Sequence, residues 1–104
     1  MVIIETPIFT KLISGLMSDN DYKDLQEAIL VRPDRGTILK NSGGLRKLRG
    51  AMESRGKSGG ARIMYYWATE YDQVYMLLAF PKNAMENLTD SQLKKLRTIV
   101  EEWS

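Results

Sequence analysis

The sequence predicts an α+β fold in which helices flank an antiparallel sheet of about four strands, in the element order β-α-α-β-β-β-α. Three observations lead to this prediction. Apolar residues recur at helical spacing in three segments, and runs rich in β-branched and aromatic residues lie around them. A chain of 104 residues supports one hydrophobic core but not two. We therefore expect residues 1–104 to form a single domain.

The first half of the chain is predicted to form a strand and then a hairpin of two helices. Residues 2–5 favour a strand, and Thr6 and Pro7 suit the cap and the first position of a helix. Ser18 is the cap candidate of a second helix, which must end before Pro33. The apolar positions of these helices are Ile8, Phe9, Leu12, Ile13 and Leu16, then Tyr22, Leu25, Ala28 and Ile29.

The second half is predicted to form a meander of three strands and a terminal helix. The strands are expected at 45–50, 62–69 and 74–80, after a turn at 33–36. Thr89 and Gln92 match a capping box, which predicts a helix start. The apolar face of that helix holds Leu93, Leu96, Val100 and Trp103.

The composition limits the chemistry of any active site. The chain has no histidine and no cysteine, which removes the usual neutral-pH base, the thiolate nucleophile and the commonest soft metal ligands. We expect no metal and no cofactor. No apolar run approaches the roughly 20 residues of a membrane helix, and the amino terminus does not resemble a secretory signal. The expected location is the cytoplasm.

The positive charge is concentrated in one part of the chain. Residues 46–62 contain six basic residues and a single acid, Glu53, so they carry +5 while the rest of the chain carries −3. The six are Arg46, Lys47, Arg49, Arg55, Lys57 and Arg62. Such a patch is typical of a surface that binds a polyanion. A solvated charged face around a loop is the alternative explanation.

Strand geometry predicts which of these residues meet. In an extended segment Arg62 shares one face with Met64 and Tyr66. The other face holds Ile63, Tyr65 and Trp67. Aromatic side chains stack nucleobases in many RNA-binding proteins. Most aromatic residues here are better explained as core, and Tyr66 remains the open candidate for an RNA contact.

The glycine-rich segment Gly56-Lys57-Ser58-Gly59-Gly60 does not predict nucleotide hydrolysis. A phosphate-binding loop requires an additional glycine where this chain has Ala51, and a helix where this chain predicts a strand. A hairpin loop accounts for these glycines.

Three segments together resemble the RelE-superfamily toxins of type II toxin–antitoxin systems, and in particular the HigB branch. They are residues 43–49 (Gly-Gly-Leu-Arg-Lys-Leu-Arg), residues 56–66 with their Gly-Gly-Ala-Arg-Ile-Met-Tyr-Tyr, and residues 77–83. The resemblance implies a small RelE-like sandwich. It also implies a ribosome-dependent, metal-independent endoribonuclease, an mRNA interferase that inhibits translation. Such an enzyme orients mRNA in the ribosomal A site and promotes attack by a ribose 2′-hydroxyl on the adjacent phosphate.

The resemblance also implies roles for individual residues. Arg62 corresponds to the arginine that stabilises the phosphate in the transition state, with Arg55, Lys57 and Lys82 as catalytic basic partners. Arg46, Lys47, Arg49 and Tyr66 are expected to bind RNA. Some relatives carry a tyrosine or histidine after the last strand, and residues 83–89 have neither. The general base is therefore open among Glu53, Glu86 and Tyr66, unless orientation and charge suffice.

The resemblance implies two partners and leaves two alternative functions. The partners are the ribosome with its mRNA and a cognate helix-turn-helix antitoxin of the HigA type, with no membrane. One alternative is a non-catalytic module that binds RNA or the ribosome through the same patch. The other is an inhibitor with the RelE fold that acts without cleaving RNA. Mapping cut sites on translated messages would separate these functions.

Overall fold

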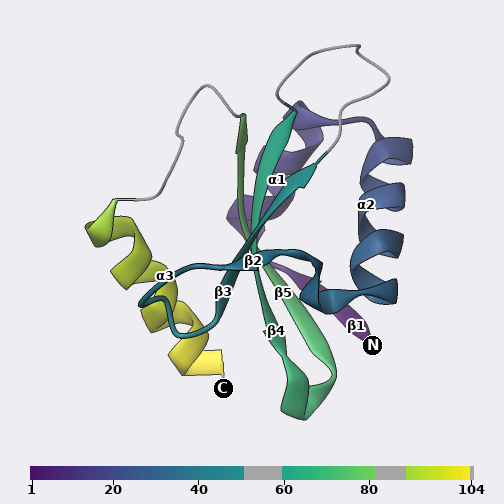
Figure 1. Cartoon of the computed structure of the whole chain (residues 1–104). Coiled ribbons are helices and arrows are strands. Elements are labelled where there is room, and N and C mark those ends of the chain that lie inside the picture. Colours follow the sequence, from purple (N-terminus) through teal and green to yellow (C-terminus); the bar gives the residue numbers. More distant parts are fainter. Residues whose placement is uncertain (51–59, 82–88, 104) are drawn as a thin grey trace.

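Five strands form the centre of the fold in the part of the chain that the computed structural model describes, residues 1–50, 60–81 and 89–103 (Figure 1). Their order across the sheet is β1-β5-β4-β3-β2. The bounds are β1 Val2–Glu5, β2 Thr37–Ile38, β3 Leu45–Gly50, β4 Ala61–Ala68 and β5 Gln73–Pro81. The predicted α+β class and the meander β3-β4-β5 are confirmed.

The sheet differs from the prediction in two respects. It has a fifth strand, because the two residues of β2 pair with β3 and extend the edge beyond the meander. It is mixed and not antiparallel, because β1 pairs with β5 in parallel, from Val2 opposite Gln73 to Glu5 opposite Met76. The strand pattern of residues 2–5 does not reveal the direction of a partner some seventy residues away, since pairing direction is set by the path of the intervening chain.

Two helices cover one face of the sheet, α1 (Pro7–Leu16) and α2 (Asp19–Val31). Both begin at the predicted caps: the Thr6 hydroxyl accepts from the Phe9 backbone N–H at 3.0 Å, and the Ser18 hydroxyl accepts from that of Asp21 at 3.1 Å. α2 ends before Pro33, as expected. A short 3₁₀ turn, η1 (Pro33–Arg35), then leads into β2.

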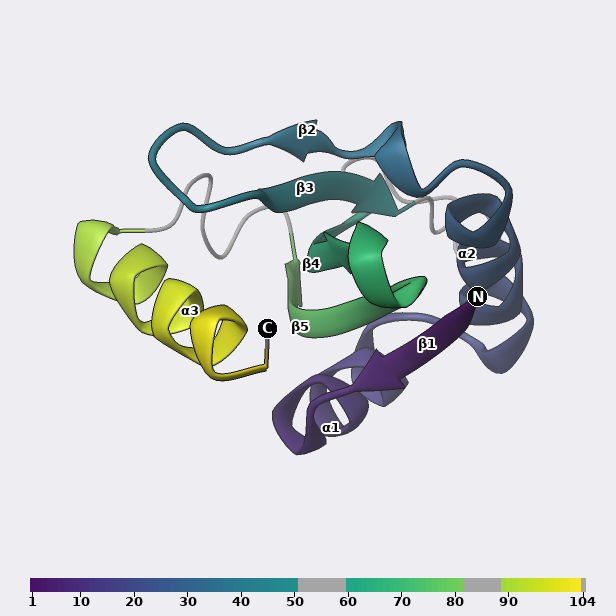
Figure 2. The same cartoon turned by 90° about the horizontal axis from the view of Figure 1, so that it is seen from below.

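The third helix, α3 (Asp90–Trp103), lies on the opposite face of the sheet (Figure 2). Its predicted capping box is present, since Thr89 and Gln92 exchange hydrogen bonds of 3.0 and 3.2 Å. Within the described part of the chain, no helix has the length and apolar character required to cross a membrane.

Each face of the sheet has its own hydrophobic cluster. Under α1 and α2 the cluster includes Phe9, Ile13, Leu25, Ile29, Ile63, Tyr65, Val74, Met76 and Ala79. Under α3 it includes Leu45, Ala68, Tyr75, Leu77, Leu96 and Val100. The alternation predicted for β4 is confirmed, because Ile63, Tyr65 and Trp67 belong to the first cluster while Tyr66 packs against the second. The sheet therefore presents a different surface to each side.

Candidate nucleic-acid interface

A basic groove lies on the α3 side of the sheet, where β3 ends and β4 begins. Arg62 on β4 stands directly across from Arg49 on β3, and Lys47 lies two residues before Arg49 on the same face. Thr37 of the edge strand β2 pairs with Lys47. These four residues line a hollow of about 300 Å³. The structure thus brings together three of the predicted site residues.

Arg62 is buried, with 7% of its surface exposed, whereas Arg49 is exposed. Like charges directly opposite each other on neighbouring strands destabilise a sheet. A pair of like charges at opposed positions is expected where a site binds a ligand of opposite charge. A polyanion in the groove would balance the positive charges of these two residues.

Removing this repulsion is expected to stabilise the free protein. Arg49→Gln should raise the melting temperature by roughly 1–5 °C, because it removes the like charge opposite Arg62, and should weaken RNA binding. Thermal unfolding and binding of a labelled RNA measure the two effects. Arg32→Gln is the matched control, because Arg32 is exposed outside the groove and 3.6 Å from Asp34. A lower melting temperature for Arg49→Gln alone would contradict a repulsive pair.

A bulge in β5 sets which residue stands beside Arg62 on the strand opposite β3. The pairing shifts between Met64 opposite Leu78 and Tyr65 opposite Met76, so that Leu77 is an extra residue. Because side chains alternate with a period of two, this shift determines which residues face Arg62. Phe80 stands across from Arg62 as a result, and it is buried. Arg62 therefore lies between Arg49 on one neighbouring strand and an aromatic residue on the other.

Arg46 lies on the opposite face of the sheet from the groove. Its guanidinium is 5.9 Å from the centre of the Trp67 ring. It donates hydrogen bonds to the backbone carbonyls of Asp34 at 3.1 Å and Gly36 at 2.8 Å. The structure therefore separates Arg46 from Lys47 and Arg49, with which the sequence grouped it as RNA-binding.

Tyr66 shares the face of Arg62 but not the groove. Its ring stacks on Tyr75, with centroids 6.5 Å apart and planes 16° from parallel. A side chain on Gly44 would come within 3.1 Å of the same ring. Tyr66 comes four residues after Arg62 in β4, with Met64 between them on the same face. Tyr66 packs in the α3 cluster. Its ring takes part in packing on this face, and its predicted contact with RNA stays a prediction.

Several predicted site residues lie outside the described residues. They are Arg55, Lys57 and Lys82, together with the two candidate bases Glu53 and Glu86. Within the described ranges, no three acidic side chains gather closely enough to hold a metal ion.

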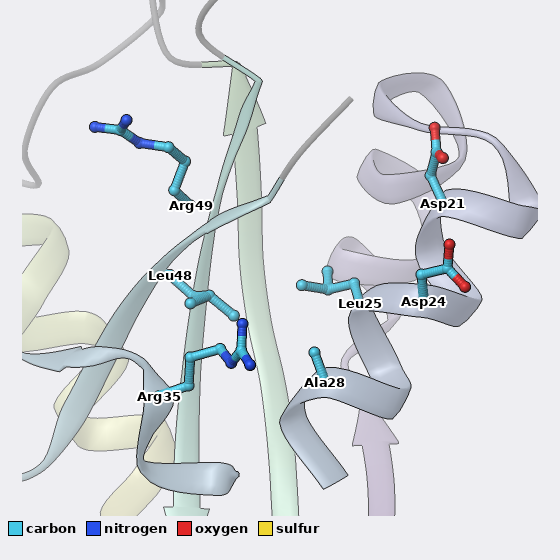
Figure 3. A pocket seen from close by; sticks show the side chains of 7 residues that line it. All are labelled: Asp21, Asp24, Leu25, Ala28, Arg35, Leu48 and Arg49. Atoms are coloured by element: carbon cyan, nitrogen blue, oxygen red, sulfur yellow. The ribbon is translucent and has the colours of Figure 1, made fainter. Parts of the chain in front are cut away.

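A second hollow, of about 230 Å³, lies between α2 and β3 on the other face (Figure 3). Leu25 and Leu48 point toward each other across it, and the Arg35 guanidinium extends toward α2. Asp21 and Asp24 add negative charge on the helix side, so this hollow has mixed charge. Arg49 lines both this hollow and the basic groove, and its side chain points away from α2 in Figure 3.

Two neighbours of the predicted cations were not predicted from the sequence: Thr37, which lines the groove, and Phe80, which pairs with Arg62. A signal for Thr37 was present, because residues 37–39 are β-favouring and precede the turn-forming segment 41–44. Reading the two segments together predicts a β-hairpin. For Phe80 no comparable signal exists, since its face depends on the bulge at Leu77.

The family of the chain follows from a comparison with known protein families. The sequence profile described as the RelE toxin of the RelE/RelB toxin–antitoxin system matches residues 5–104. The chain belongs to the RelE toxin family. The match extends from the end of β1 to the end of α3, so it covers the strands that carry the basic groove. RelE toxins are components of toxin–antitoxin systems, and membership therefore implies an antitoxin as partner.

Proposed function

We propose that this RelE toxin is a ribosome-dependent endoribonuclease that cleaves mRNA in the ribosomal A site, in the cytoplasm. One observation carries the proposal: buried Arg62 lines a groove with Arg49 and Lys47 of the neighbouring strand. Three adjacent positive charges suit a phosphate backbone. Strands of a sheet also hold such charges more rigidly than loops do, which favours stabilisation of a transition state.

In the proposed reaction the substrate supplies its own nucleophile. The 2′-oxygen of one ribose forms a bond to the adjacent phosphorus while the bond from phosphorus to the 5′-oxygen of the next nucleotide breaks. The 2′-hydroxyl loses its proton and the 5′-oxygen gains one, which leaves a cyclic phosphate and a 5′-hydroxyl. Arg62 stabilises the additional negative charge on the phosphate oxygens, because guanidinium binds two such oxygens at once.

The remaining basic residues take supporting roles in this proposal. Lys47 and Arg49 bind flanking phosphates along the groove. Arg55, Lys57 and Lys82 are proposed to add positive charge near the reacting phosphate. Among the described residues that line the groove, none has a carboxylate. We therefore propose that the ribosome completes the site for proton transfer, or that Glu53 or Glu86 does.

The proposed antitoxin is of the HigA type, with a helix-turn-helix domain. It would neutralise the toxin by covering the basic groove with acidic and apolar groups, since complementary charge speeds and directs association. Co-expression with the toxin should yield a complex that survives dilution and no longer cleaves RNA.

Ribosome dependence is the first experimental test. The purified toxin should cleave messages that are being translated and should cleave the same RNA poorly when ribosomes are absent. Mapping of the 5′ ends in both reactions measures this difference. Equal cleavage of free and translated RNA would contradict the dependence on ribosomes. Binding to ribosomes without any cut message would instead support an inhibitor or RNA-binding module that does not cleave.

A further inference from the structure

Two side chains from the central strands hold the turn that precedes β2. The Tyr65 hydroxyl donates to the carbonyl of Pro33 at 2.7 Å and accepts from the Gly36 backbone N–H at 2.8 Å. Arg46 binds the carbonyls of Asp34 and Gly36 from the same side. We call Tyr65 and Arg46 the turn clamp. Tyrosine is protonated at neutral pH and can donate, and burial raises the pKa of the Tyr65 hydroxyl further.

The turn clamp determines where β2 lies. β2 has only two residues, and Thr37 follows Gly36 directly. Within β2, Ile38 pairs with Arg46 and Thr37 pairs with Lys47. Neighbouring side chains of a strand point to opposite faces. A turn held by Tyr65 and Arg46 therefore places the Thr37 side chain on the face of Lys47, which is the groove side. A strand this short depends on such anchors, because its own ladder is small.

Thr37 differs chemically from the other described residues that line the groove. Lys47, Arg49 and Arg62 only donate hydrogen bonds, whereas the Thr37 hydroxyl also accepts them. Phosphate oxygens only accept, so the three cations satisfy them. The ribose 2′-hydroxyl carries a proton that requires an acceptor, and this hydroxyl distinguishes RNA from DNA.

We propose that Thr37 accepts a hydrogen bond from a ribose 2′-hydroxyl of RNA in the groove, and that Arg46 acts as a positioning residue by holding the turn before Thr37. The inference rests on the proposed function only in taking the groove as the RNA site. It assigns the preference for RNA over DNA to the edge strand and not to the cationic residues.

The first experiment compares RNA and DNA oligonucleotides of one sequence, bound to the purified toxin without ribosomes. Thr37→Val should reduce the preference for RNA about three- to tenfold, the range expected for one hydrogen bond, with little change in DNA binding. Thr37→Ser retains the hydroxyl and should keep the wild-type preference for RNA. Oligonucleotides with 2′-fluoro sugars, which cannot donate, should bind the wild type as DNA does.

Other results of this comparison would overturn the inference. An equal loss of RNA and DNA binding in Thr37→Val would mean that Thr37 contacts phosphate. An unchanged preference would mean that it contacts no sugar. Thr37 is exposed on a strand and valine favours strands, so this variant should fold. Because cleavage is not measured, failure of the proposed nuclease activity would be seen separately, in the mapping of cut messages.

The second experiment tests whether Arg46 acts through Thr37. Arg46→Met should reduce the preference for RNA in the wild type but have no further effect when Thr37 is already valine. It should also leave the salt dependence of RNA binding unchanged, because a positioning residue neutralises no phosphate. Arg49→Gln is the contrast. It should reduce the slope of the logarithm of RNA affinity against the logarithm of salt concentration by roughly 0.7 to 1. A similar fall in slope for Arg46→Met would show instead that Arg46 binds phosphate directly.

Discussion

Arg62→Ala is expected to lower the rate of mRNA cleavage on ribosomes by roughly 10²-fold or more, as the loss of one preorganised charged donor commonly does. The physical reason is the position of Arg62, which is buried on a central strand and lines the basic groove. Arg62→Lys should recover only part of the rate, since an ammonium group cannot bind two phosphate oxygens in the manner of guanidinium. Single-turnover cleavage of a programmed message measures both effects.

Burial of Arg62 requires a control for packing. Alanine removes the aliphatic stem together with the charge, and the stem packs in a site that is only 7% exposed. Arg62→Met retains most of that stem, so its fold should be preserved while cleavage stays as low as in Arg62→Ala. Near-normal cleavage by a folded Arg62→Met protein would show that the charge is dispensable. Lys57 or Lys82 would then be the principal cation at the scissile phosphate.

Gly36→Ala is expected to destabilise the protein by about 2–4 kcal/mol, through overpacking and the loss of hydrogen bonds in the turn. The cause is steric and not conformational, because φ at Gly36 is −73°. An added Cβ would lie 2.8 Å from both Cε1 and the hydroxyl of Tyr65, and 3.1 Å from the Cβ of Arg46. The turn would have to move away from the clamp. Chemical or thermal unfolding measures the loss.

Gly15→Ala is the matched control for this substitution. A Cβ at Gly15, within α1, meets no atom within 4 Å. Alanine favours helices over glycine, so this variant should gain up to about 1 kcal/mol. If Gly36→Ala were as stable as the wild type, the turn would tolerate displacement and the turn clamp would lose its assigned role. Gly36→Ala should also weaken the preference for RNA, because Thr37 moves with the turn.

Local signals in the sequence determined most of the secondary structure. The caps at Thr6, Ser18 and Thr89 were correctly predicted, because a cap involves residues within three positions of each other. The division of β4 into two faces was also correct, because side chains alternate along any strand. The concentration of positive charge in residues 46–62 is likewise a property of the sequence alone.

The composition of the groove depended on contacts between distant segments. The alternation of side chains along β3 places Arg46 on the opposite face from Lys47 and Arg49. It does not predict which of the two faces remains accessible. The α1 and α2 cluster and the turn clamp occupy the face of Arg46. The other face carries the hollow that Lys47, Arg49 and Arg62 line.

By itself, then, the sequence determined the fold class, the helix starts, the alternation of faces and the basic character of the site. Only the tertiary structure decided that β1 runs parallel to β5, that β2 places Thr37 in the groove, and that a bulge turns Phe80 toward Arg62. The physical reason is the range of the interactions. Periodicity and capping act within a few residues, whereas strand direction, register and the choice of exposed face follow from packing across the whole sheet.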